Sequence, residues 1–118
     1  MIRKMSLVVA VCCIAFLLTS CDRKKIGEIN ADPGQFNGKE VAVAGRVTSV
    51  SLGALGMGFY QIDDGTGRLF VLSERRGAPS EGAYVGVKGK ILPTFTFLGK
   101  NYATVLHESD RRAVHPSD

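Results

Sequence analysis

The stretch that decides the fold is EVAVAGRVTSVSLGALGMGFYQIDDGTGRLFVLS, residues 40–73. Apolar and polar residues alternate at a period of two, and the alternation is interrupted twice, by a glycine-rich segment at 51–58 and by DDGTG at 63–67. Short alternating runs separated by glycine-rich turns are typical of antiparallel strands joined as a meander. The stretch therefore predicts three consecutive β-strands.

The first strand of this stretch has one apolar face. Val41, Val43, Gly45 and Val47 share that face, and we predict that it points into a core. A glycine in the middle of a strand indicates sharp coiling or the close approach of another backbone. A small barrel requires such coiling where one strand serves both of its sheets.

The second and third strands are predicted at about 59–63 and 68–73, paired across the turn between them. The inward residues expected from the alternation are Tyr60, Ile62, Leu69 and Val71. The outward residues are then Phe59, Gln61, Arg68 and Phe70. Two outward aromatic rings beside an arginine form a candidate platform for stacking a ligand.

Two adjacent acids, Asp63 and Asp64, stand in the turn between these strands. Gly65 and Gly67 permit positive φ, and Asp side chains accept hydrogen bonds from turn amides. A metal site is the alternative, but no third acid or histidine lies at ligand spacing. We therefore assign Asp63, Asp64, Gly65 and Gly67 to turn structure.

The remaining chain predicts two more strands. Residues 74–82 contain too many helix breakers for a helix and are expected to cross the bottom of the barrel as a loop. Strand four is expected at about 83–92, a hairpin loop containing Phe95 and Phe97 at 93–99, and strand five at about 101–106. Residues 108–118 are expected to form a flexible polar tail.

The N-terminal segment has the features of an export signal. Arg3 and Lys4 precede a 12-residue apolar run at 7–18, and Leu18-Thr19-Ser20-Cys21 follows directly. This segment resembles a bacterial lipoprotein signal peptide at all four positions of the L-[AST]-[GAS]-C box. The resemblance implies a signal peptide at 1–20 and acylation of Cys21, by palmitate or similar chains. An ordinary secretory signal and an uncleaved anchor are the alternatives.

A lipoprotein signal has consequences for location and chemistry. The protein is expected on the periplasmic side of a cell membrane, and Asp22 resembles a signal for retention on the inner membrane in enteric bacteria. Cys12 and Cys13 would be removed with the signal, so the mature domain keeps no thiol for a disulfide, zinc site or nucleophile. Loss of Arg3 and Lys4 from 15 basic residues leaves 13 against 11 acidic ones, a weakly basic balance that does not by itself indicate nucleic acid.

A segment at 21–38 is expected to serve as tether and lead-in. Asp32 and Pro33 are suited to begin one helical turn. Ile26, Ile29 and Phe36 are predicted to cover one open end of the barrel as an apolar lid.

Three segments together carry a specific resemblance. They are P-x-x-F-x-G-K-x-V-x-V-x-G-x-V at 33–47, Y-x-I-D-D-G-T-G at 60–67 and E-G-A-x-V-x-V-x-G at 81–89. The chain resembles bacterial OB-fold domains of the tRNA-anticodon-binding type over about 26–107. The resemblance implies an all-β domain, a small five-stranded Greek-key barrel at about 39–107. The helix that larger members carry between strands three and four is missing here.

The resemblance also implies where a ligand binds. The site would be the face of strands two and three, framed by the loops at 51–58 and 93–99. The candidate residues are Arg46, Phe59, Gln61, Arg68, Phe70, Lys88, Phe95 and Phe97. The alternative for the four phenylalanines is packing, under the lead-in segment or within the hairpin, and for the cations it is a solvated face.

Three functions are compatible with the sequence. The first is an envelope binding module for an extended ligand; the resemblance implies single-stranded nucleic acid, and an oligosaccharide is another candidate. The second is a structural lipoprotein that docks on an envelope protein complex. The third is carriage of haem or another small ligand. His107 suggests haem by similarity to a haem chaperone with an H-x-x-x-Y stretch, although position 111 is Arg.

No catalytic or phosphate-loop motif is present in the sequence, so we expect no enzyme activity and no cofactor. The sequence leaves the oligomeric state open.

Overall fold

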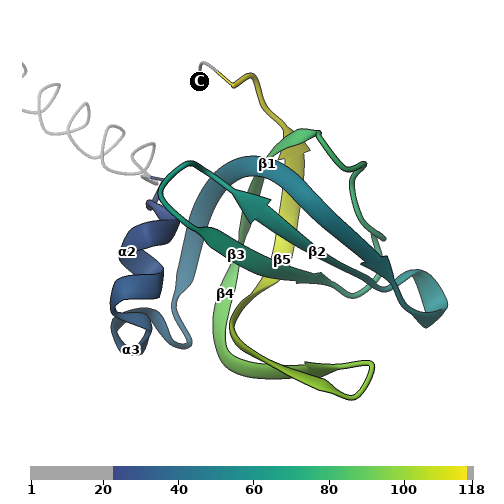
Figure 1. Cartoon of the computed structure of the whole chain (residues 1–118), viewed down its shortest axis with the longest axis horizontal. Coiled ribbons are helices and arrows are strands. Elements are labelled where there is room, and N and C mark those ends of the chain that lie inside the picture. The colour runs from purple at the N-terminus through teal and green to yellow at the C-terminus, as the bar shows by residue number, and fades with distance from the viewer. Residues whose placement is uncertain (1–22, 117–118) are drawn as a thin grey trace, which may run out of the picture.

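The computed structural model describes residues 23–116 of the 118-residue chain (Figure 1). The proposed signal peptide, Cys21 and Asp22 lie outside the described residues. The elements, in chain order, are α2 (Ile26–Ala31), α3 (Pro33–Phe36), β1 (Glu40–Leu52), the 3-10 turn η1 (Ala54–Gly56), β2 (Gly58–Asp63), β3 (Arg68–Ser73), β4 (Tyr84–Phe97) and β5 (Lys100–Ala113). Among residues 23–116, no helix has the length and apolar character needed to cross a membrane.

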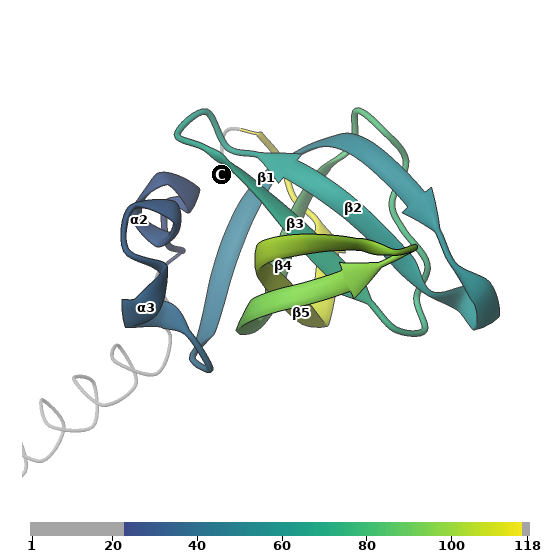
Figure 2. The ribbon, with the colours of Figure 1, turned by 60° about the horizontal axis from the view of Figure 1, so that its bottom comes forward.

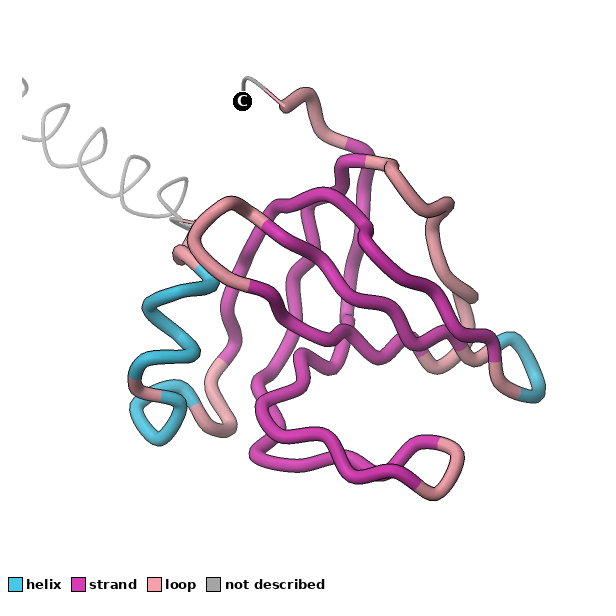
Figure 3. The backbone as a smooth tube through the Cα atoms, viewed as in Figure 1, coloured by secondary structure: helices cyan, strands magenta, loops and turns pink. Residues whose placement is uncertain are grey.

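The five strands close into a barrel, as predicted. Their order around the barrel is β1-β2-β3-β5-β4, with β4 returning to β1, and only the β3–β5 pair is parallel. The first half of β1 pairs with β4 and its second half with β2, so this one long strand serves both sides (Figure 3). A Cβ added to Gly45 would lie 2.8 Å from the carbonyl oxygen of Asp63, which is the close backbone approach that the glycine indicated.

The barrel interior is filled by the predicted inward faces. Val43, Val47, Tyr60, Ile62 and Val71 are each at most 1% exposed. The other members of this core are Ile26, Ile29, Val41, Leu69, Val85, Val87, Ile91 and Leu106. Alternation placed the side chains of the strands, because a closed sheet has a single inside and every second residue must enter the core; Ile26 and Ile29 come from α2 instead.

The lead-in segment covers one end of the barrel through two short helices rather than one turn. Ile26 and Ile29 on α2 are fully buried, and Phe36 on α3 packs against the same core. Pro33 begins α3, but the side chain of Asp32 makes no capping hydrogen bond. The lid was therefore correctly predicted, whereas the capping role of Asp32 was not.

Strands β4 and β5 both continue beyond their predicted C-terminal ends. The segment expected as a loop at 93–99 continues as β4 to Phe97, and the expected tail continues as β5 to Ala113. Pro93 has no N–H to donate, and Thr104 opposite it has a φ of +58°. The pair bends here, while Leu92–Val105 and Thr94–Ala103 keep the ladder on either side. Pro93 therefore marks a bend within β4 and not the end of the strand.

Candidate ligand-binding face

Beyond the bend, the β4–β5 hairpin lies across the outer face of β2 and β3 (Figure 2). A second apolar cluster fills the space between hairpin and sheet, on the opposite side of the sheet from the barrel core. Its buried members are Phe59, Leu72, Phe97 and Val105, and its partly buried members are Met57, Phe70, Phe95 and Tyr102. We call this group the aromatic cluster.

Phe59 lies at the centre of the aromatic cluster. Its ring stacks on Phe70 at 5.1 Å and on Phe97 at 4.8 Å between centroids, and it meets Tyr102 edge-on at 4.7 Å. Phe59 is only 3% exposed and Phe97 6%, so neither ring offers a face to a ligand. Phe59 and Phe97 are therefore packing residues, which was the alternative to ligand binding. The β4–β5 hairpin covers Phe59, and the lead-in segment does not.

The rim of the aromatic cluster remains accessible. Phe70, Phe95 and Tyr102 are half-buried, and the ammonium nitrogen of Lys100 lies 5.4 Å from the centroid of the Tyr102 ring. Tyr102 and Lys100 were not among the predicted site residues. The sequence could have indicated Tyr102. If the antiparallel pairing of strands four and five is continued beyond Pro93, Tyr102 stands opposite Phe95.

The loop tips beside this rim carry exposed leucines. Leu52 at the end of β1 is 67% exposed, Leu55 in η1 97% and Leu98 at the hairpin turn 81%. The β1–β2 loop and the hairpin are in contact, since a Cβ on Gly53 would lie 3.4 Å from the Phe97 ring. The two predicted framing loops thus lie next to each other at one end of the molecule.

Of the polar candidates, only Gln61 lies beside the aromatic cluster, where it pairs in register with Phe70. Its side-chain oxygen accepts a hydrogen bond of 3.1 Å from the Thr48 hydroxyl. The structure therefore brings Gln61 together with Phe59, Phe70, Phe95 and Phe97.

The three predicted cations lie elsewhere. Arg68 is at the opposite end of the β2–β3 pair, with its Nε 3.2 Å from the carboxylate of Asp63. Arg46 donates a hydrogen bond of 2.9 Å to the carbonyl oxygen of Gly82. Lys88 is on the outer wall of β4, 3.3 Å from Glu40. None of the three lines the aromatic cluster.

The two turn acids make the contacts of a turn, and Asp64 also holds the lid. Asp64 accepts hydrogen bonds from the backbone N–H groups of Thr66 and Gly67, and from that of Ile26 at the start of α2. Burial tends to raise the pKa of the Asp64 carboxyl, but these hydrogen bonds outweigh it and hold the pKa below its usual value. Within residues 23–116, no three metal-ligating side chains gather at one place.

His107 lies on β5, next to a hollow that Arg75 and Arg76 also line. Its Nε2 is 3.0 Å from the carboxylate of Glu74. The ring is therefore engaged with a charged neighbour in polar surroundings.

Comparison with solved structures places this geometry among known folds. An asparaginyl-tRNA synthetase from Pyrococcus horikoshii complexed with asparaginyl-adenylate matches 79% of this chain with a TM-score of 0.63 and 18% identity. A second structure of that synthetase matches 68% of the chain, with a TM-score of 0.56 and 19% identity. A replication protein A heterotrimer bound to single-stranded DNA matches 66%, with a TM-score of 0.50 and 22% identity. The chain has the OB-fold.

These likenesses concern the fold alone. The OB-fold barrel spans 22% and 20% of the two synthetase chains and 58% of the replication protein A chain. No protein-family model matches the sequence, and no curated protein is significantly similar to it. The function must therefore be argued from the site.

Proposed function

We propose that this chain is a non-enzymatic OB-fold binding module that holds an extended ligand at the rim of the aromatic cluster, with single-stranded nucleic acid as that ligand. The supporting observation is the half-buried trio Phe70, Phe95 and Tyr102 at the rim of the aromatic cluster. Each base has an apolar face, and stacking on an aromatic side chain contributes about 1–3 kcal/mol per base. Buried Phe59 fixes the orientation of the trio, so little side-chain entropy is lost on binding.

The charge around the rim suits modest affinity. Lys100 is the cation in contact with the cluster, and it would meet a phosphate of a strand stacked on Tyr102. One or two such contacts give a shallow dependence on salt, because each neutralised phosphate releases less than one counterion. The similar replication protein A structure, which is bound to single-stranded DNA, supports the same choice of ligand.

We further propose that the module is a lipoprotein on the periplasmic side of the membrane, held by acyl chains on Cys21. The Leu-Thr-Ser-Cys box at 18–21 supports this anchor. Each buried methylene contributes about 0.8 kcal/mol, so two or three chains hold a small domain at a bilayer. Cys21→Ser should move the protein out of the membrane fraction and abolish the acyl mass of the N-terminal peptide; acylation without Cys21 would contradict the anchor.

The ligand is tested by titrating fluorescent single strands with the mature protein at several salt concentrations. Phe70→Ala and Tyr102→Ala should each weaken binding about ten-fold, a loss of about 1.4 kcal/mol. Tyr84→Ala is the matched control, because Tyr84 is also half-buried but is not a member of the aromatic cluster. No binding, or an equal loss in the control, would exclude this ligand at this rim.

A protein of an envelope complex is the second candidate, favoured by the exposed leucines at the loop tips. Leu55 and Leu98 would form the apolar centre of a protein interface. Leu55→Asp with Leu98→Asp should abolish a protein contact, detected by site-specific crosslinking in membranes, without affecting strand binding. Haem carriage has the least support, since His107 is engaged with Glu74.

A further inference from the structure

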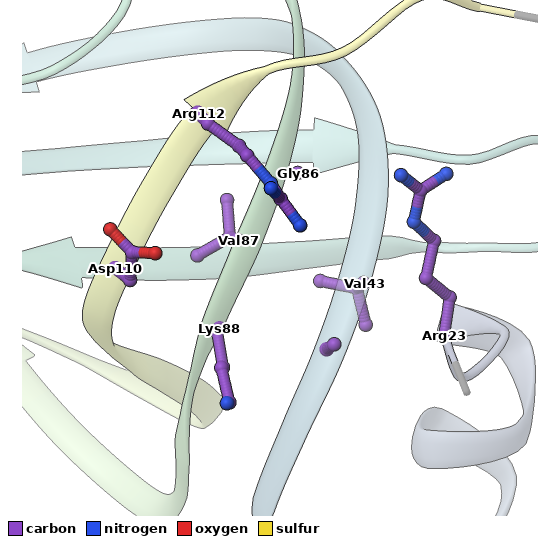
Figure 4. A pocket seen from close by; sticks show the side chains of 8 residues that line it. Arg23, Val43, Gly86, Val87, Lys88, Asp110 and Arg112 are labelled. Atoms are coloured by element: carbon purple, nitrogen blue, oxygen red, sulfur yellow. The ribbon is translucent and has the colours of Figure 1, made fainter. Parts of the chain in front are cut away.

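The outer wall formed by β1, β4 and β5 carries a hollow of about 140 Å³ (Figure 4). Small residues, Ala42 and Gly86, form its floor. Three cations line it, Arg23 from the lead-in segment, Lys88 from β4 and Arg112 from β5, together with one acid, Asp110. We call this surface the basic wall; it is separate from the aromatic cluster.

Two acids lie on the basic wall, and each pairs with a cation, Asp110 with Arg76 and Glu40 with Lys88 of the wall itself. The carboxylate of Asp110 lies 3.2 Å from Arg76, and that of Glu40 lies 3.3 Å from Lys88. Both pairs are solvent-exposed, and such pairs contribute at most about 1 kcal/mol, so a cation can exchange its carboxylate for another anion at little cost. Lys90 follows Lys88 on the same outward face of β4, which adds a fourth cation to the wall.

Chain length limits how far the proposed anchor can lie from this wall. Arg23 forms a β-bridge with Ala42, and the N–H of Lys24 donates to the carbonyl oxygen of Ala42 at 2.7 Å. Cys21 is two residues before Arg23, and two fully extended residues span at most about 7 Å. A bilayer holding acylated Cys21 can therefore come within about one Debye length of Arg23, at the edge of the hollow.

We infer that the basic wall docks on anionic phospholipid headgroups of the membrane that holds Cys21. The inference rests on the anchor in the proposed function. Arg23, Lys88 and Arg112 surround a hollow that fits a phosphate-bearing headgroup, and Lys24 and Lys25 add exposed charge next to the anchor.

The test uses residues 22–118 without acyl chains, which include every residue of the barrel core and the lid. Co-sedimentation is measured with vesicles of phosphatidylcholine alone and of phosphatidylcholine mixed with phosphatidylglycerol. We expect binding to the anionic vesicles only. Each cation near an anionic leaflet strengthens binding about five-fold, so Lys88→Ala with Arg112→Ala should reduce the partition coefficient roughly ten- to thirty-fold.

Arg68→Ala with Arg75→Ala is the matched control, since it removes the same charge away from the wall, at the far end of the β2–β3 pair and beside the β1–β2 loop. Equal losses in the two double variants, or binding to neutral vesicles, would overturn the inference. So would inhibition by inorganic phosphate beyond that of chloride at equal ionic strength, which would indicate a site for the free ion. Loss of oligonucleotide binding in the wall variant alone would instead assign the wall to nucleic acid.

The inference and the proposed function fail separately. Oligonucleotide titration of the Phe70 and Tyr102 variants reports on the aromatic cluster, whatever the vesicles show. Mass analysis of the N-terminal peptide reports on the anchor. Vesicle binding by the unacylated domain depends on neither.

Discussion

The hydroxyl of Tyr60 donates a hydrogen bond to the carboxylate of Glu108, which lies 48 residues later in the chain. Tyr60 is fully buried in the barrel, and the Glu108 side chain is 1% exposed. Arg111 completes the group: its Nη1 is 3.2 Å from Glu108, and its guanidinium lies 5.5 Å from the centre of the Tyr60 ring. A buried carboxylate is tolerated here because both a cation and a hydroxyl satisfy it.

This group also closes the bottom of the barrel. Arg111 donates to the carbonyl oxygens of Arg76 and Gly77, which fixes the β3–β4 loop across the opening. Burial, and then the hydrogen bond to Glu108, raise the pKa of Tyr60 above its ordinary value, so the phenol stays protonated.

Tyr60→Phe should therefore lower the free energy of unfolding by about 1–3 kcal/mol, because Glu108 loses a donor while still buried. Urea unfolding followed by circular dichroism measures the loss. Tyr84→Phe is the control and should leave stability within about 0.5 kcal/mol of the original. Similar behaviour of the two variants would mean that the Tyr60 hydroxyl is not needed.

Phe59→Ala should destabilise the protein by about 3–5 kcal/mol, because it removes the central ring of the aromatic cluster and leaves a cavity. Phe70→Ala, at the half-buried rim, should cost clearly less. Thermal unfolding of the two variants measures the difference. A small effect of Phe59→Ala would mean that the hairpin does not pack on the sheet as described.

Asp64→Asn should destabilise the fold at neutral pH by about 1–2 kcal/mol, since the amide cannot accept every hydrogen bond from Ile26, Thr66 and Gly67. The folded pKa of Asp64 is below the value of about 3.9 for an unfolded carboxyl. The stabilisation is therefore complete above that value and is lost as pH falls through the folded pKa. Urea unfolding at several pH values should show that the difference in unfolding free energy between the original protein and Asp64→Asn becomes smaller in acid. A difference that does not change with pH would contradict this role of Asp64.

Thr104→Gly should stabilise the protein by about 1 kcal/mol, because a β-branched residue at a φ of +58° is strained and glycine is not. Thr94→Gly, next to Pro93 on the facing strand, is the matched control and should destabilise. Urea midpoints of the two variants are compared with the original. Destabilisation by both changes would mean that Thr104 carries no strain.

Most of the barrel was predictable because the patterns that specify it lie within single strands and turns. Alternation in 40–73 and 83–92 fixed which side chains enter the core, and Gly45 marked the coiled strand. The DDGTG turn was readable from residue type, since aspartates and glycines meet the requirements of a tight turn. The contact of Asp64 with Ile26 was not readable, because it joins segments 38 residues apart.

The candidate site was predicted only in part, for a reason of packing. Sequence alternation placed Phe59 and Phe70 outside the barrel, and both lie there, but whether an outward ring is accessible depends on what covers it. The cover came from a hairpin that continues past Pro93 instead of ending there. Its bend at Thr104 requires an unusual backbone conformation that the sequence does not signal.

The sequence by itself determined strands with one apolar side to bury, because their polarity alternates with a period of two, and the resemblance to OB-fold domains implied that five of them close into a barrel. Only the tertiary structure decided that Phe59 is packing rather than surface, that Glu108 is buried, and that the basic wall adjoins Arg23. Each of these features depends on which segments, far apart in the sequence, are in contact in the folded protein. Periodicity assigns a side chain to a face, whereas the free energy of burying a ring or an ion depends on the partner across from it.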